Sequence, residues 1–152
     1  MTYWCGIDPG KKGAICFLDE YGIIEFVDIN TSGGALLEWF YDHSPRIMLE
    51  RVTPMQKGGL VSAWRFGHSV GRIEGILECT ELGYDTVPPK TWQKECGVII
   101  PPKTPPAQRK RITEAVVNRL YPKAEIYGPK GGLLDGRADA LLIAHYCMLR
   151  YK

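Results

Sequence analysis

Hydrophobic residues in the first thirty positions fall into three runs of strand length, separated by short polar turns. "YWCGID" (3–8) and "GAICFLD" (13–19) flank a glycine- and lysine-rich turn, and "IIEFVDI" (23–29) follows the turn "EYG". Short apolar runs bounded by glycine and proline are typical of β-strands. Because the connections between the runs are so short, we expect three strands in an antiparallel meander.

The remainder of the chain alternates between helical and strand patterns. Three segments carry apolar residues at helical spacing: 34–44, 107–121 and 134–151. "RIMLERV" (46–52) has the length of a strand, "YDTVPPKTW" (84–92) predicts a last strand ended by its double proline, and 97–106 predicts a loop. A strand that follows a helix here is expected to lie parallel to the first strand. The pattern therefore predicts an α/β fold, with a mixed five-stranded sheet flanked by helices.

A long helix is expected from about residue 60 to residue 82, where no proline interrupts the chain. Small residues recur four apart along it, at Ala63, Gly67, Gly71 and Gly75. Positions four apart share one helix face, so this face carries almost no side chain and something should pack closely against it. Two partners are equally compatible with the pattern, namely the sheet of the same molecule and the matching helix of a second subunit.

Length and composition support one domain spanning residues 1–152. The chain has 152 residues, of which 45% are hydrophobic, enough for one well-buried core and too few for two ordinary domains. No apolar run approaches the roughly 20 residues of a membrane helix, so a soluble, cytoplasmic protein is expected. Its five cysteines show no CxxC pair, which favours buried free thiols over a disulfide framework or a zinc site.

Charge is distributed unevenly along the chain. Residues 1–50 contain three Lys/Arg and eight Asp/Glu, whereas residues 103–123 contain six Lys/Arg and a single Glu. An acidic segment and a basic segment within one domain suggest a carboxylate site that must also attract a polyanion. A solvated helix face is the simpler explanation of the basic segment taken alone.

Four acidic residues stand where folding stability alone would not place them. Asp8 and Glu50 each end a strand that enters the core, while Asp135 and Asp139 lie one turn apart on the last helix. Neighbouring parallel strands would bring the first two to one sheet edge, and the helix face could lie over that edge. Converging carboxylates repel one another unless a divalent cation lies among them, and oxygen ligands favour Mg²⁺ or Mn²⁺. The alternative is ordinary ion pairing with the adjacent Arg51 and Arg137.

Three segments together resemble the RuvC-type Holliday-junction resolvases, in particular their short phage-encoded branch. They are "GIDPGKKGA", "LERV" and "DGRADALLIAHY", in that order along the chain. "SAWRFGHSVGRIEGIL" and "VPPKTWQKECGV" between them are also similar to this branch, so the likeness spans nearly the whole chain. The resemblance implies a ribonuclease-H-like fold and a metal-dependent endonuclease that makes paired cuts in two strands of a four-way DNA junction.

The resemblance also implies roles for the four carboxylates as catalytic metal ligands. Asp8 would be shared by two Mg²⁺ ions, for which Mn²⁺ could substitute, Glu50 would complete one ion, and Asp139 with Asp135 the other. In bacterial members of this family the last two acids are usually three residues apart, whereas Asp135 and Asp139 are four apart. Asp135 therefore comes one position early, and Gly136 stands where the third ligand is expected. A second departure lies just beyond the strand glutamate, where Thr53, Pro54 and Met55 replace a stacking aromatic residue.

The expected partners are branched DNA and a second copy of the chain. The candidate phosphate contacts are Lys103, Arg109, Lys110 and Arg111, with Lys11 and Lys12 beside the carboxylates as a further pair. Matched nicks in two strands require two carboxylate sites, so a two-fold symmetric homodimer is expected, joined along the small-residue helix face. A related nuclease that cuts RNA in a hybrid, or a simple nicking nuclease, is the serious alternative, since the metal chemistry would be identical.

Overall fold

The computed structural model describes residues 1–53 and 58–152, and its centre is a five-stranded mixed sheet. The strands are β1 (Tyr3–Ile7), β2 (Ala14–Asp19), β3 (Ile24–Asp28), β4 (Arg46–Glu50) and β5 (Asp85–Val87), in the spatial order β3-β2-β1-β4-β5. The first three form an antiparallel meander, and β4 and β5 continue the sheet in parallel with β1. This confirms the fold class expected from the hydrophobic pattern.

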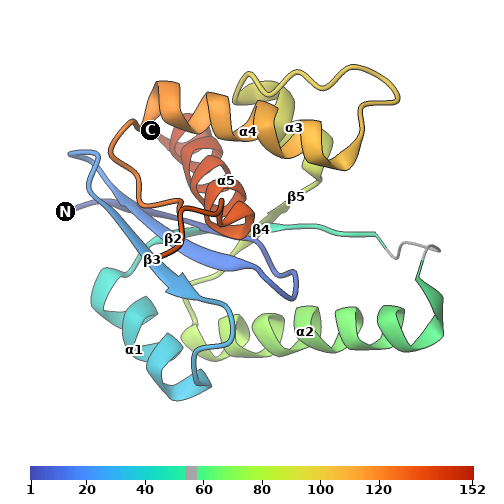
Figure 1. Cartoon of the computed structure of the whole chain (residues 1–152). Coiled ribbons are helices and arrows are strands. Elements are labelled where there is room, and N and C mark those ends of the chain that lie inside the picture. The colour runs from blue at the N-terminus through green and yellow to red at the C-terminus, as the bar shows by residue number, and fades with distance from the viewer. Residues whose placement is uncertain (54–57) are drawn as a thin grey trace.

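Helices cover both faces of this sheet (Figure 1). They are α1 (Gly33–His43), α2 (Gly59–Thr80), α3 (Pro89–Glu95), α4 (Pro106–Leu120) and α5 (Asp135–Tyr151). One apolar cluster joins α3, α4 and α5 to one face of the sheet, and a second joins α1 and the end of α2 to the other. The central strand β1 lies between the two clusters and is buried on both sides, which explains its continuous apolar sequence.

α5 packs unusually close to β1 because Gly6 has no side chain. A Cβ at Gly6 would lie 2.2 Å from both the Ala140 carbonyl oxygen and the Ala144 amide nitrogen. The facing side of α5 is also small, with Ala140 and Ala144 completely buried. The backbones of β1 and α5 are therefore almost in contact, and this contact sets the distance between α5 and the sheet.

The small-residue face of α2 does not pack against the sheet. A Cβ at Gly67, Gly71 or Gly75 would meet nothing within 4 Å, whereas Ile73 and Leu77 on another face of the helix are buried. The first turns of α2 project away from the rest of the chain (Figure 1). Of the two partners compatible with the sequence, the sheet of the same molecule is therefore wrong for this face.

α3 was not expected from the sequence pattern. The last strand ends at Val87, and Pro88 and Pro89 then begin a short helix through Glu95, which occupies much of the range 84–92 where only a strand was expected. Proline is well suited to the first helical position, because its missing N–H would have no intrahelical acceptor there and its φ is already helical. The double proline therefore both ends the strand and starts the helix.

All five cysteines are free, as expected, and all are buried except Cys79. Within the two described ranges of the chain, no helix combines the length and apolar character needed to cross a membrane.

Candidate functional site

Asp8 lies immediately beyond β1, in a turn held by its own backbone hydrogen bonds. The Asp8 amide donates to the Ala14 carbonyl at 3.0 Å, and the Gly10 amide donates to Asp8 Oδ1 at 3.1 Å. A Cβ at Gly13 would lie 1.9 Å from the Asp8 carbonyl oxygen, so only glycine fits at this position of the turn between β1 and β2. The turn therefore fixes the Asp8 carboxyl group at the end of the strand.

Glu50 occupies the matching position on the neighbouring parallel strand. Ile7 of β1 pairs with Leu49 of β4, so Asp8 and Glu50 both follow the last paired residues at one edge of the sheet. Glu50 Oε2 accepts a 2.7 Å hydrogen bond from the indole N–H of Trp92 on α3. The expected meeting of the two strand ends is confirmed, and Trp92 is a contact that the sequence did not reveal.

Asp135 and Asp139 are brought to this edge by the first turn of α5. Gly136 lies against the β1–β2 turn, where a Cβ would stand 2.0 Å from the Lys12 carbonyl oxygen. The absence of a side chain at Gly136 therefore lets the helix start directly over the turn that carries Asp8. It also means that no side chain fits at position 136 without a shift of the backbone.

Burial and mutual repulsion raise the pKa of three of these carboxyl groups. Burial is the largest cause at Asp139, whose pKa is well above its usual range and is raised further by Asp8, Glu50 and Asp135. Burial followed by the charge of Asp8 raises the pKa of Glu50 to about 7, against a lowering by the Trp92 hydrogen bond. The pKa of Asp8 is raised by burial and Asp135, and lowered by the Gly10 amide. The four groups therefore form one electrostatically coupled cluster.

Asp19 shows what a structural buried aspartate looks like in the same sheet. Its side chain is buried, and Oδ1 accepts hydrogen bonds from the amides of Tyr21 and Ile23 at 2.9 and 2.8 Å. These bonds close the β2–β3 hairpin, so the carboxylate is explained by the turn it stabilises.

The two arginines adjacent to the cluster do not neutralise it. Arg137 donates to the Glu125 carbonyl oxygen at 2.9 Å and places its guanidinium over the ring of Phe26. Within residues 1–53 and 58–152, the ion pair between Lys110 and Asp135, at 3.1 Å, is the only one that involves any of the four carboxylates. Pairing with Arg51 and Arg137, the alternative left open by the sequence, is therefore contradicted.

The basic segment divides between the carboxylate cluster and solvent. Arg109 and Lys110 line a small hollow of about 240 Å³ together with Asp135 and Asp139. Arg111 instead forms a 2.9 Å ion pair with Glu114 on the same helix. Lys103 is exposed in the loop before α4, with a positive φ of 60°. The structure thus brings two of these four basic residues to the cluster.

A second hollow, of about 480 Å³, lies on the other side of Asp135. Lys11 and Lys12 from the β1–β2 turn line it together with Asn30, Leu134 and Asp135. Asp135 therefore lines both hollows, with two basic side chains in the wall of the first and three, Arg137 included, in the wall of the second. A polyanionic strand that followed both would pass directly over the carboxylate cluster.

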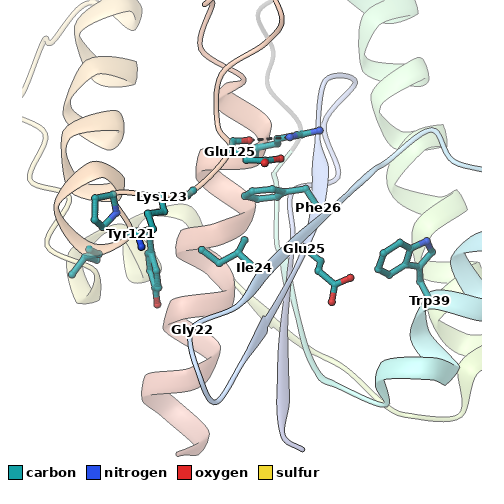
Figure 2. A pocket seen from close by; sticks show the side chains of 12 residues that line it. Gly22, Ile24, Glu25, Phe26, Trp39, Tyr121, Lys123 and Glu125 are labelled. Carbon is teal, nitrogen blue, oxygen red and sulfur yellow. Dashed lines mark hydrogen bonds between the residues drawn. The ribbon is translucent and has the colours of Figure 1, made fainter.

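A larger hollow lies elsewhere, beside the edge strand β3. It has a volume of about 730 Å³, and Figure 2 shows Ile24 and Phe26 of β3 facing Tyr121 across it. None of the four acidic residues lines this pocket. Size alone does not mark the functional site in this protein.

The donor set of the cluster fits a divalent cation in its chemistry. All four candidates offer carboxylate oxygens, the ligands preferred by Mg²⁺ and Mn²⁺. Burial first, and then the neighbouring carboxylates, raise the pKa of Asp8, Glu50 and Asp139. In their present conformations, no three His, Cys, Asp or Glu side chains of the described residues are grouped closely enough to hold one ion. Ion binding therefore requires these side chains to turn toward one another.

No protein-family model matches the chain, and no curated protein matches its sequence. Among solved structures, "T. thermophilus RuvC in complex with Holliday junction substrate" superimposes with a TM-score of 0.65 and 15% identity, covering 99% of this chain and 96% of that one. "Thermus thermophilus RuvC structure" gives a TM-score of 0.60 and 16% identity, covering 96% and 95%. The chain therefore has the ribonuclease-H-like fold of these RuvC structures over nearly its whole length.

Proposed function

We propose that this protein is a Mg²⁺-dependent, structure-selective endonuclease of the RuvC type, from the short phage-encoded branch, that resolves four-way DNA junctions. The observation that carries the proposal is the coupled cluster of Asp8, Glu50, Asp135 and Asp139, bordered on both sides by basic hollows. Fold similarity to a RuvC bound to a Holliday junction supports it. Residues 1–152 would form one nuclease domain that acts in the cytoplasm, which is the host cytoplasm for a phage protein.

The four carboxylates would hold two Mg²⁺ ions, or Mn²⁺ in their place. Asp8 is the proposed shared ligand, with Glu50 on one ion and Asp139 with Asp135 on the other. Two such ions activate a water molecule and stabilise the leaving oxygen in phosphodiester hydrolysis. The β1–β2 turn, the end of β4 and the first turns of α5 would hold the backbone of these four residues in place, and their side chains would turn toward the ions.

Basic residues on either side of the cluster would bind the DNA backbone. Lys11 and Lys12 would contact phosphates in one hollow, and Arg109 and Lys110 in the other. Lys103 and Arg111, exposed on the α4 side, would contact phosphates farther along the duplex. Lys110 is paired with Asp135 and must break this ion pair to reach a phosphate. DNA binding by Lys110 and metal binding by Asp135 would therefore both require the pair to separate.

A homodimer would supply the two sites that paired cleavage needs. The open face of α2 at Gly67, Gly71 and Gly75 allows another helix to approach closely, and Trp64 beside it is 68% exposed. A two-fold interface there would fix the spacing between the two carboxylate clusters.

One cleavage assay tests the function directly, with a four-way junction, an RNA/DNA hybrid and a plain duplex as substrates. With Mg²⁺ we expect cleavage of the junction, and loss of cleavage in Asp8→Asn, Glu50→Gln and Asp139→Asn while junction binding stays intact or tightens. Asp135→Asn should also be severe. Asp42→Asn, on the exposed surface of α1, is the matched control and should cleave normally.

The substrates also separate the proposal from its rivals. Preferred cleavage of the RNA/DNA hybrid would identify a ribonuclease of the same fold, and unpaired nicks in every substrate would identify a simple nicking nuclease. Near wild-type Mg²⁺-dependent rates in folded Asp8→Asn would reject the metal mechanism altogether.

A further inference from the structure

Among residues 1–53 and 58–152, Trp92 makes the shortest hydrogen bond to the carboxylate cluster. Its indole N–H donates to Glu50 Oε2 at 2.7 Å, and the Trp92 side chain is almost fully buried. An N–H···O bond of this length to a carboxylate is at the short, strong end of the usual range. Glu50 is thus held by a partner that cannot move into solvent.

Local structure determines where the indole lies. The Arg51 amide donates to the Val87 carbonyl, which fixes the end of β5 beside Glu50, and α3 begins two residues later. On the opposite side, the Cys96 thiol donates to the Leu142 carbonyl of α5 at 3.2 Å. α3 is therefore anchored between the sheet edge and the helix that carries Asp139.

The chemistry of indole makes this contact one-directional. A tryptophan N–H is a donor only, carries no charge and does not ligate metals. It therefore always occupies one oxygen of the Glu50 carboxylate and leaves the other oxygen available. The hydrogen bond also favours the ionised carboxylate in a place where burial and Asp8 oppose ionisation.

We infer that Trp92 is a positioning residue that orients Glu50 for metal binding, by holding Oε2 and leaving Oε1 available to an ion. The inference rests on the proposed function only in taking Glu50 as a metal ligand. A purely structural role is the rival account, in which Glu50 serves as the acceptor that a buried indole N–H requires.

The two accounts differ in their effect on metal affinity, which can be measured without DNA. Mn²⁺ binding to the full-length protein is followed by calorimetry in wild type and in Trp92→Phe, which keeps an aromatic ring and removes the N–H. Loss of a partner that orients a metal ligand typically lowers metal affinity about 10- to 100-fold. We therefore expect the Kd of Trp92→Phe for Mn²⁺ to be at least about tenfold higher than that of wild type. In a Glu50→Gln background the same substitution should change the Kd less than twofold.

Trp4→Phe is the matched control. Trp4 is also nearly fully buried and belongs to the same apolar cluster as Trp92, so this substitution tests loss of core packing alone. We expect its Mn²⁺ affinity to stay within twofold of wild type. Should Trp92→Phe fail to fold, benzothienylalanine at position 92 preserves the shape of the indole, replaces its N–H with sulfur and should give the same tenfold loss.

Equal Mn²⁺ affinity in wild type and folded Trp92→Phe would overturn the inference while leaving the proposed function intact. Equal weakening by Trp92→Phe and Trp4→Phe would also overturn it, because packing would then explain the effect. Wild-type protein that binds no Mn²⁺ would overturn the proposed metal-dependent function itself, and the inference with it.

Discussion

Gly136, in the first turn of α5, lies directly against the backbone of Lys12, whose carbonyl oxygen would be 2.0 Å from a Cβ at Gly136. A helix start is thus packed against a strand–strand turn with no side chain between them. Because Asp135 and Asp139 are carried by this helix and Asp8 by this turn, the contact sets the spacing of the candidate ligands.

A methyl group at Gly136 should therefore impair the site as well as the fold. We expect Gly136→Ala to lower the free energy of unfolding by about 2 kcal/mol or more, since backbone atoms rather than a flexible side chain must move. Cleavage should fall more than tenfold in protein that is still folded at the assay temperature. Gly132→Ala is the control, because a Cβ there meets nothing within 4 Å; equal thermal midpoints and rates for the two variants would contradict the prediction.

Stability without metal should decrease as pH rises from about 4.5 to about 7. Folding raises the pKa of Glu50 from 4.5 to about 7, so between these values the folded protein binds a proton that the unfolded chain has released. The free energy of unfolding therefore falls across this window and is lowest above pH 7. Mg²⁺ should restore part of it, because it binds the folded state.

Glu50→Gln should remove much of this pH dependence. At pH 8 we expect the variant to be more stable than metal-free wild type by about 1–2 kcal/mol, or roughly 2–8 °C in thermal midpoint, with little difference at pH 4. Glu38→Gln, on the exposed surface of α1, should follow the wild-type profile. Parallel midpoint–pH curves for wild type and Glu50→Gln would show that Glu50 is not responsible.

The basic residues beside the carboxylates should contribute more to DNA binding than Arg111 does. We expect Arg109→Gln and Lys110→Gln each to weaken binding to every DNA tested and to reduce the slope of log K against log salt by about 0.9. Arg111→Gln should reduce it less, because Arg111 is already paired with Glu114. Titration of each variant with labelled junction at several salt concentrations measures these slopes. If all three variants had the wild-type slope, the basic segment would be a solvated helix face that does not contact DNA.

Gly71→Leu should convert a dimer into a folded monomer. The side chain has room in the isolated chain, since a Cβ at Gly71 meets no neighbour, but it would block close approach of a second helix. Sedimentation should report the change in mass, and paired cuts on a cruciform plasmid should be lost while weak nicking persists. Gly34→Leu, at an equally open position in α1, is the control. Wild-type protein that sediments as a monomer with and without junction DNA would reject the dimer.

The sequence by itself determined the order and type of most elements. Hydrophobic periodicity and turn residues are local properties, so the meander, β4, α2, α4 and α5 follow from them, with only small shifts in their bounds. The meeting of Asp8 and Glu50 was also predictable, because parallel pairing of two strands necessarily brings their ends to one edge. Pro54 and Met55, which depart from the RuvC pattern, lie outside the described residues.

Only the tertiary structure decided which side chains face the carboxylates. Arg137 is adjacent to the cluster in sequence yet points to Phe26, whereas Trp92 is 42 residues from Glu50 and donates to it. The open face of α2 and the close contact at Gly136 were equally invisible in the sequence, because glycine permits exposure and tight packing alike. Side-chain direction depends on how helices dock on the sheet, and docking is set by long-range contacts that no local pattern encodes.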